Sequence, residues 1–228
     1  MRTYTVISGD LVAYTSLNAL EKEQLEQRID QLLTHLAARF NTYSRRVKGD
    51  YLECVVPNPA DALAIAVALK THITSFKIKR NSDDERLKAF QTYGIRLALG
   101  HGTLDRFDIE KGIIDGEAIY RSGRAISKES THDKDRVVIK NTLFYSDQDE
   151  ARSNTIDTLL ALLDHILAKA TRRQSEVIYH KILGHSEQEI AKLLGISQSS
   201  INQHSTASGW NAIDKTVDYF ATLYSTSS

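Results

Sequence analysis

The chain is poor in cysteine and proline. Cys54 is its only cysteine, and Pro57 and Pro59 are its only prolines among 228 residues. A single cysteine can form neither an intrachain disulfide nor a cluster of thiolate metal ligands. No apolar run of about 18 residues and no apolar leader are present, so we expect neither a membrane span nor a signal peptide. These absences predict a cytoplasmic protein that has no membrane partner.

The chain also lacks an excess of either charge. Lys and Arg total 29, Asp and Glu total 29, and the formal net charge is zero. From Asp149 onward, seven Lys or Arg residues stand against nine Asp or Glu residues. Because neutralisation of phosphates dominates affinity for DNA, a monomer of this composition would bind DNA weakly. Binding to DNA would therefore require a homodimer.

The front part of the sequence alternates between strand and helix patterns. Its strand segments are rich in β-branched and aromatic residues or alternate in polarity, and its helix segments carry apolar residues at a spacing of 3.6. The expected strands cover residues 3–8, 44–48, 51–56, 93–101 and 136–140, and the expected helices cover 18–43, 60–77 and 116–128. Residues 79–85 read as a charged surface turn. This βαββαβαβ order predicts an α/β or α+β domain over residues 1–146, with a ferredoxin-like mixed sheet.

Residues 147–228 are expected to form a second, all-α domain. A polar connector at 147–153 precedes helical patterns at 155–170, 173–183 and 209–223. Between the last two lies the stretch SEQEIAKLLGISQSSINQHSTAS, residues 186–208. Ser186 and Glu189 match a capping box, and Gly195 suits the left-handed end of a helix. Ser197 can cap a second helix that buries Ile201, so the stretch predicts a helix-turn-helix.

In the DNA-binding form of this motif the second helix lies in the major groove. The side chains expected to reach base edges or phosphates are those of Gln198, Ser199, Ser200, Asn202 and Gln203. Arg172 and Arg173 are the expected phosphate contacts nearby. Two plainer alternatives stay open. The stretch 186–208 could be a helical hairpin that only packs, and Arg172 and Arg173 could lie at a solvated helix start without contacting phosphate.

Two Gly-Asp dipeptides end at Asp10 and Asp50, the first closing a strand and the second within a hairpin. Carboxylates that meet across neighbouring strands can hold a divalent metal through oxygen ligands, commonly with a nucleoside triphosphate. The alternative is a pair of turn aspartates that accept hydrogen bonds from nearby backbone N–H groups.

Four segments resemble motifs of the class III nucleotidyl cyclases. They are residues 10–17 (DLVAYTSL), 48–56 (KGDYLECVV), 94–102 (GIRLALGHG) and 115–124 (DGEAIYRSGR). The resemblance implies a cyclase-like domain that dimerises. It also implies that Asp10 and Asp50 are metal aspartates, for Mg or Mn with a nucleotide, and that Arg124 is the arginine that stabilises the transition state.

The nucleotide-reading positions of that resemblance depart from the cyclase pattern. Tyr120 stands where cyclases place the asparagine that orients the ribose. Glu117 stands at the position of a purine-reading aspartate, and Arg46 at that of a base-reading lysine. Arginine and lysine are not interchangeable at a site that recognises its ligand through the geometry of the donor group. Catalysis needs the complete set of catalytic residues held in place, so we expect binding of a nucleotide-like ligand rather than turnover.

The whole chain resembles the SatD family more closely. The likeness covers the I-x-G-D opening, the D-G-x-A-x-Y-x-x-R-x-A-I helix and the terminal E-I-A-x-x-L-G-I-S-Q-S-S-I segment. It implies a cyclase-like domain fused to a helix-turn-helix. The leading hypothesis is a DNA-binding transcriptional regulator with a degenerate, non-catalytic dimerisation or sensor domain. The alternatives are a divergent metal-dependent cyclase or phosphotransfer enzyme, and a protein-interaction module.

Overall fold

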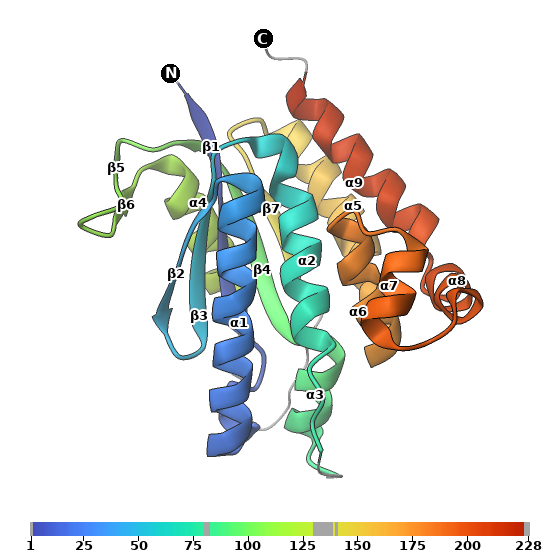
Figure 1. The fold of residues 1–228 in the computed structure, drawn as a ribbon. Helices are drawn as coiled ribbons and strands as arrows, with labels where there is room; N and C mark the ends of the chain where they lie inside the picture. Colours follow the sequence, from blue (N-terminus) through green and yellow to red (C-terminus); the bar gives the residue numbers. More distant parts are fainter. Residues whose placement is uncertain (1, 80–82, 130–138, 140, 226–228) are drawn as a thin grey trace.

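A five-stranded mixed sheet forms the centre of the protein (Figure 1). The computed structural model describes residues 2–79, 83–129, 139 and 141–225. The strand order is β2-β3-β1-β4-β7. The strands are β1 (Thr3–Leu11), β2 (Tyr43–Lys48), β3 (Tyr51–Val56), β4 (Ile95–Thr103) and β7 (Leu143–Ser146). Strand β1 runs antiparallel to β3 and β4, whereas β4 and β7 are parallel.

Helices cover both faces of this sheet. Helices α1 (Ala19–Phe40) and α2 (Ala62–Thr74) pack on one face, and α4 (Glu117–Glu129) packs on the other. Successive side chains of β1 point to opposite faces of the sheet. Ile7 joins the core under α1 and α2, whereas Val6 contacts Ala118 of α4. Helix α4 lies very close to β4 because Gly100 has no side chain there. A Cβ atom on Gly100 would lie 2.2 Å from the carbonyl oxygen of Ala118.

In the described part of the chain, five further helices follow β7. They are α5 (Glu150–Ala168), α6 (Arg172–Ile182), α7 (Glu187–Leu194), α8 (Gln198–Ala207) and α9 (Trp210–Ser225). Figure 1 shows α5, α6 and α9 stacked beside α2, with α7 and α8 at the outer corner. The apolar core is continuous from Ile7 to Leu160, Ile178 and Phe220 on these helices. The boundary expected at 146/147 therefore does not coincide with a gap in the core, and the division into two domains stays a prediction.

A buried ion pair also joins α2 to α5. Lys70 is 1% exposed, and its Nζ lies 3.1 Å from Oδ1 of Asp164. The same ammonium donates to the carbonyl oxygens of Tyr93 and Ile95 and to the Thr142 hydroxyl. Asp164 in turn accepts from the backbone N–H and the hydroxyl of Thr142. Every charge in this cluster is thus hydrogen-bonded, as burial demands.

The mixed α/β sheet predicted from the sequence is confirmed, and the structure adds elements that the sequence analysis missed. Helix α3 (Glu85–Tyr93) was missed, because its charged start looks like the continuation of the surface turn before it. The strand expected at 136–140 lies outside the described residues except for Ile139, and the strand beside β4 is β7. A small hairpin, β5 (Arg106–Asp108) and β6 (Ile113–Asp115), was also unforeseen. Within the described segments, no helix has both the length and the apolar character to cross a bilayer.

Candidate functional site

The two aspartates singled out in the sequence lie at the same end of the sheet. Asp10 is near the end of β1, directly across from Tyr51 of β3. Asp50 immediately precedes Tyr51, and its carbonyl oxygen accepts from the backbone N–H of Leu11 at 2.8 Å. The antiparallel register of β1 and β3 therefore brings the two residues together, as their positions in the sequence suggested.

The side chain of Asp10 forms an ion pair with Arg96 of β4, which lies opposite it in the β1–β4 register. Both side chains are largely buried, at 22% and 17% exposure. A guanidinium on this carboxylate competes directly with a metal cation. Among the residues that the structure describes, no three His, Cys, Asp or Glu side chains form a cluster able to hold a metal. Binding of Mg or Mn between Asp10 and Asp50 would therefore require Arg96 to leave the Asp10 carboxylate.

Arg96 was not singled out in the sequence analysis. The pairing of Arg96 with Asp10 depends on the register between strands 86 residues apart, which no local pattern reveals.

The candidate nucleotide residues of α4 share its exposed side. Glu117, Tyr120 and Arg124 are all exposed. The hydroxyl of Tyr120 donates to the carboxylate of Asp115, and Glu117 lies 3.7 Å from the guanidinium of Arg121. Hydrogen bonding to the Asp115 carboxylate raises the pKa of Tyr120, so this side chain is a neutral phenol at pH 7. Tyr120 is therefore oriented by Asp115 rather than held ready for a ribose.

Arg46 does not join these α4 residues. It pairs across the sheet with Leu52, whose side chain belongs to the core under α1 and α2. Its guanidinium bonds Asp30 at 2.8 Å and Glu26 at 2.9 Å, both on α1. Glu117, Tyr120 and Arg124 lie on the helix that covers the opposite face. A role for Arg46 in reading a base stays a prediction, and it would require Arg46 to leave both carboxylates.

The stretch 186–208 folds as two helices joined by a tight turn. Ser186 accepts from the backbone N–H of Glu189 at 3.3 Å, and Glu189 accepts from that of Ser186 at 2.7 Å. Gly195 ends α7 in the left-handed conformation, with φ of 65°. Ser197 then caps α8 by accepting from the backbone N–H of Ser200 at 3.1 Å. Local capping signals therefore fix both helix ends at the positions expected from the sequence.

Helices α6, α7 and α8 share a small apolar core of their own. Val177, Ile190 and Ile201 are completely buried against one another. On the other side of α8, the side chains of Gln198, Ser199, Asn202 and Gln203 are exposed, while Ser200 is half-buried. The apolar side of α8 is thus fixed to its neighbours, and its polar side faces solvent.

The two candidate phosphate contacts lie at the start of α6. Arg173 forms an ion pair with Glu176 at 2.8 Å, and Arg172 approaches the same carboxylate at 3.5 Å. Both arginines are half-buried. One carboxylate therefore offsets part of the positive charge expected to meet phosphate. Lys181, the next basic residue, is also paired, at 3.2 Å from Glu187.

These features describe a mixed α/β protein whose helical extension carries a paired-helix turn. Among solved structures, a bacterial light-regulated adenylyl cyclase is 13% identical, matches 63% of this chain and 75% of that chain, and gives a TM-score of 0.43. The dimeric guanylyl cyclase domain of the RhoGC fusion protein from the aquatic fungus Blastocladiella emersonii is 19% identical over 56% of this chain and 74% of that one, with a TM-score of 0.39. The adenylyl cyclase CyaB from P. aeruginosa is 17% identical over 55% and 71%, with a TM-score of 0.37.

No family model matches the sequence, and no curated protein matches it. Because the identities to solved structures are low and the superpositions partial, the function has to be argued from the side chains of this chain.

Proposed function

We propose that this protein is a DNA-binding transcriptional regulator that reads DNA through α8. The observation that carries the proposal is the two-sided character of this helix. Ile201 is buried against Val177 and Ile190, whereas the polar residues on its other side face solvent. Any packed surface helix has two such sides; what favours DNA reading is that the exposed side of this second helix of a helix-turn pair carries Gln and Asn side chains. Gln and Asn side chains on such a helix can bond adenine bidentately in the major groove.

The second part of the proposal is a homodimer. One chain offers few unpaired basic groups near α8, because Arg172, Arg173 and Lys181 all face carboxylates. Affinity for DNA depends on the number of phosphates neutralised, so a second copy would double that number. Two α8 helices would then read half-sites one or two helical turns apart. The α/β part would supply the dimer contact, in line with the resemblance to SatD proteins and to class III cyclases.

A gel-shift titration against genomic fragments tests DNA binding. The Gln203→Ala variant should weaken binding about 5- to 100-fold, because a bidentate base contact contributes about 1–3 kcal/mol. Gln24→Ala is the matched control, since Gln24 is also an exposed glutamine, on α1. A wild-type dimer that shows no preference for any fragment over random DNA at low salt would refute the proposal.

We further propose that the cyclase-like half binds a nucleotide-like ligand without turning it over. Three observations count against turnover: the Arg96 guanidinium on Asp10, the tyrosine at position 120, and the attachment of Arg46 to α1. Incubation with each of the four nucleoside triphosphates and manganese provides the test. Formation of a cyclic nucleotide or pyrophosphate by wild-type protein, but not by an Arg124→Ala variant, would establish the enzyme alternative instead.

A further inference from the structure

A cavity of about 350 Å³ opens at the end of the sheet opposite to Asp10 and Asp50. It is lined by the first residue of β1, the last residues of β4, the start of α4 and the start of α5. In Figure 1 this end is at the top, where β1 begins, α5 begins and α9 ends. The volume falls within the range of small-molecule sites in proteins. Neither the DNA-reading helix nor the Asp10 end of the sheet uses this cavity.

A buried, ionised carboxylate forms part of the cavity wall. The side chain of Asp147 is 2% exposed and accepts from the Tyr145 hydroxyl at 2.6 Å and from Nε of Arg152 at 2.7 Å. The backbone N–H of Asp149 adds a third hydrogen bond at 3.2 Å. Burial alone would raise the pKa of Asp147, but these hydrogen bonds hold it below its ordinary value. The carboxylate is therefore satisfied by the protein, and it fixes the orientation of Arg152.

Arg152 also lines the cavity. Its Nε is bound to Asp147, and its Cζ lies 5.9 Å from the ring centre of Tyr224. No bond to its two terminal nitrogens is made by the residues that the structure describes, and the side chain is 36% exposed. Two parallel N–H groups on a fixed guanidinium match the two oxygens of a carboxylate.

The carboxylates of Glu117 and Asp149 also line this cavity. Glu117, at the start of α4, is 46% exposed, and its nearest basic partner, Arg121, is 3.7 Å away. Asp149 uses one carboxylate oxygen to cap α5, accepting from the Arg152 backbone N–H at 3.0 Å. Burial lowers the pKa of His101, so its imidazole is neutral at pH 7 and adds no positive charge. The cavity therefore carries the Arg152 guanidinium at the start of α5 and the Glu117 carboxylate at the start of α4.

We propose that this cavity binds a small zwitterion of amino-acid size, whose carboxylate pairs with Arg152 and whose ammonium group pairs with Glu117. The inference goes beyond DNA binding and does not depend on it, because it concerns other residues and is measured without DNA. A ligand with only one charge would engage only one of the two groups, and the other would keep only its pairing within the protein, Arg152 with Asp147 or Glu117 with Arg121. The juxtaposition of both groups around one cavity thus selects for a bipolar molecule.

Isothermal titration calorimetry of the full chain with the protein amino acids tests the proposal, with n-butylamine and butyrate as single-charge probes. At least one amino acid should bind in the micromolar to millimolar range, and both single-charge probes should bind at least about ten-fold more weakly, since one charge-assisted contact is lost. Absence of binding by every amino acid would overturn the proposal, and so would n-butylamine or butyrate binding as tightly as the best amino acid.

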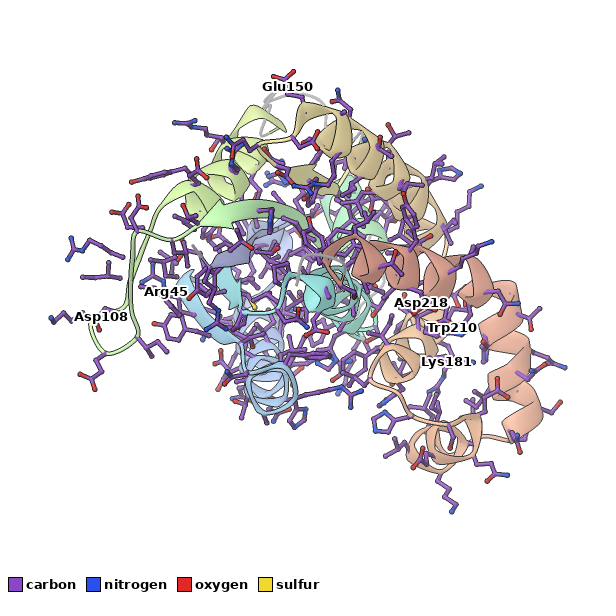
Figure 2. The ribbon with its side chains drawn as sticks, turned by 90° about the horizontal axis from the view of Figure 1, so that it is seen from above. Arg45, Asp108, Glu150, Lys181, Trp210 and Asp218 are labelled. Atoms are coloured by element: carbon purple, nitrogen blue, oxygen red, sulfur yellow. The ribbon has the colours of Figure 1, made fainter. Side chains whose placement is uncertain are left out.

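Substitutions assign the two ends of the ligand. Glu117→Gln removes an exposed charge and Arg152→Lys keeps the ion pair with Asp147, so both variants should fold. Each should weaken amino-acid binding about 10- to 100-fold. Glu150→Gln is the matched control, because Glu150 is exposed, neighbours Asp149 and lies outside the cavity lining (Figure 2). Equal binding by wild type and Glu117→Gln would refute the assigned orientation.

Discussion

The buried pair of Lys70 and Asp164 gives the sharpest prediction on stability. Lys70→Met removes the ammonium, fits an unbranched side chain into the same space and leaves the Asp164 carboxylate only 5% exposed. Breaking a buried ion pair from one side costs about 3–5 kcal/mol, because the remaining charge stays buried without its partner. Total stability of a protein is about 5–15 kcal/mol, so the variant should lose a large share of it.

Urea denaturation followed by circular dichroism measures this loss. With a dependence of about 3 kcal/mol per molar urea, the midpoint of Lys70→Met should fall by about 1–1.7 M. The double variant Lys70→Met/Asp164→Leu should recover most of the difference, since neither charge is then buried. The reasoning would be refuted if the urea midpoint of the single variant fell by less than about 0.3 M. It would also be refuted if the double variant were less stable than the single one.

Three further predictions concern α8, α4 and α2. Ile201→Ala should lower the free energy of unfolding by about 2–4 kcal/mol. Amide hydrogen exchange should become faster in α7 and α8 than in the rest of the chain, and an equal increase everywhere would contradict a separate small core. In urea denaturation, Gly100→Ala should lower the free energy of unfolding by at least about 2 kcal/mol, because its Cβ would meet backbone atoms of α4 at 2.2 and 2.5 Å. Gly123→Ala, whose Cβ would have nothing within 4 Å, should instead raise it by up to about 1 kcal/mol. Burial lowers the pKa of His72 to about 3, so protonation of the unfolded chain should remove about 1.5 kcal/mol of stability between pH 6.5 and 5. Urea titrations at both pH values should show a shallower loss in His72→Leu.

Local signals explain why the helical turn at 186–208 could be placed from the sequence. The capping pairs of Ser186 with Glu189 and of Ser197 with Ser200 are contained within four residues each. The end of α7 depends on Gly195 alone. Such signals act through the backbone of one helix, so they can be recognised without knowing the rest of the fold.

Contacts between distant segments explain what the sequence could not reveal. The partner of Asp10 is 86 residues away in β4, and the partner of Lys70 is on α5. The cavity at the other end of the sheet combines residues from β1, β4, α4 and α5. The packing of α6 and α9 against α2 follows from the fit of apolar surfaces, which the helical periodicity of each segment leaves open. The site residues on one helix were therefore easier to predict than those that the fold assembles.

Helix α9 has a consequence for the energetics of the DNA recognition proposed for α8. The chain leaves the α/β core through α6, forms α7 and α8, and returns through α9, whose Phe220 is buried in the main core. At the far end of α9, the hydroxyl of Tyr224 bonds that of Tyr145 on β7. Helix α8 is thus part of an insertion held at both ends rather than a tail on a linker. In the proposed binding to DNA, the cost of ordering this segment on docking would therefore be small, which would partly offset the scarcity of basic side chains.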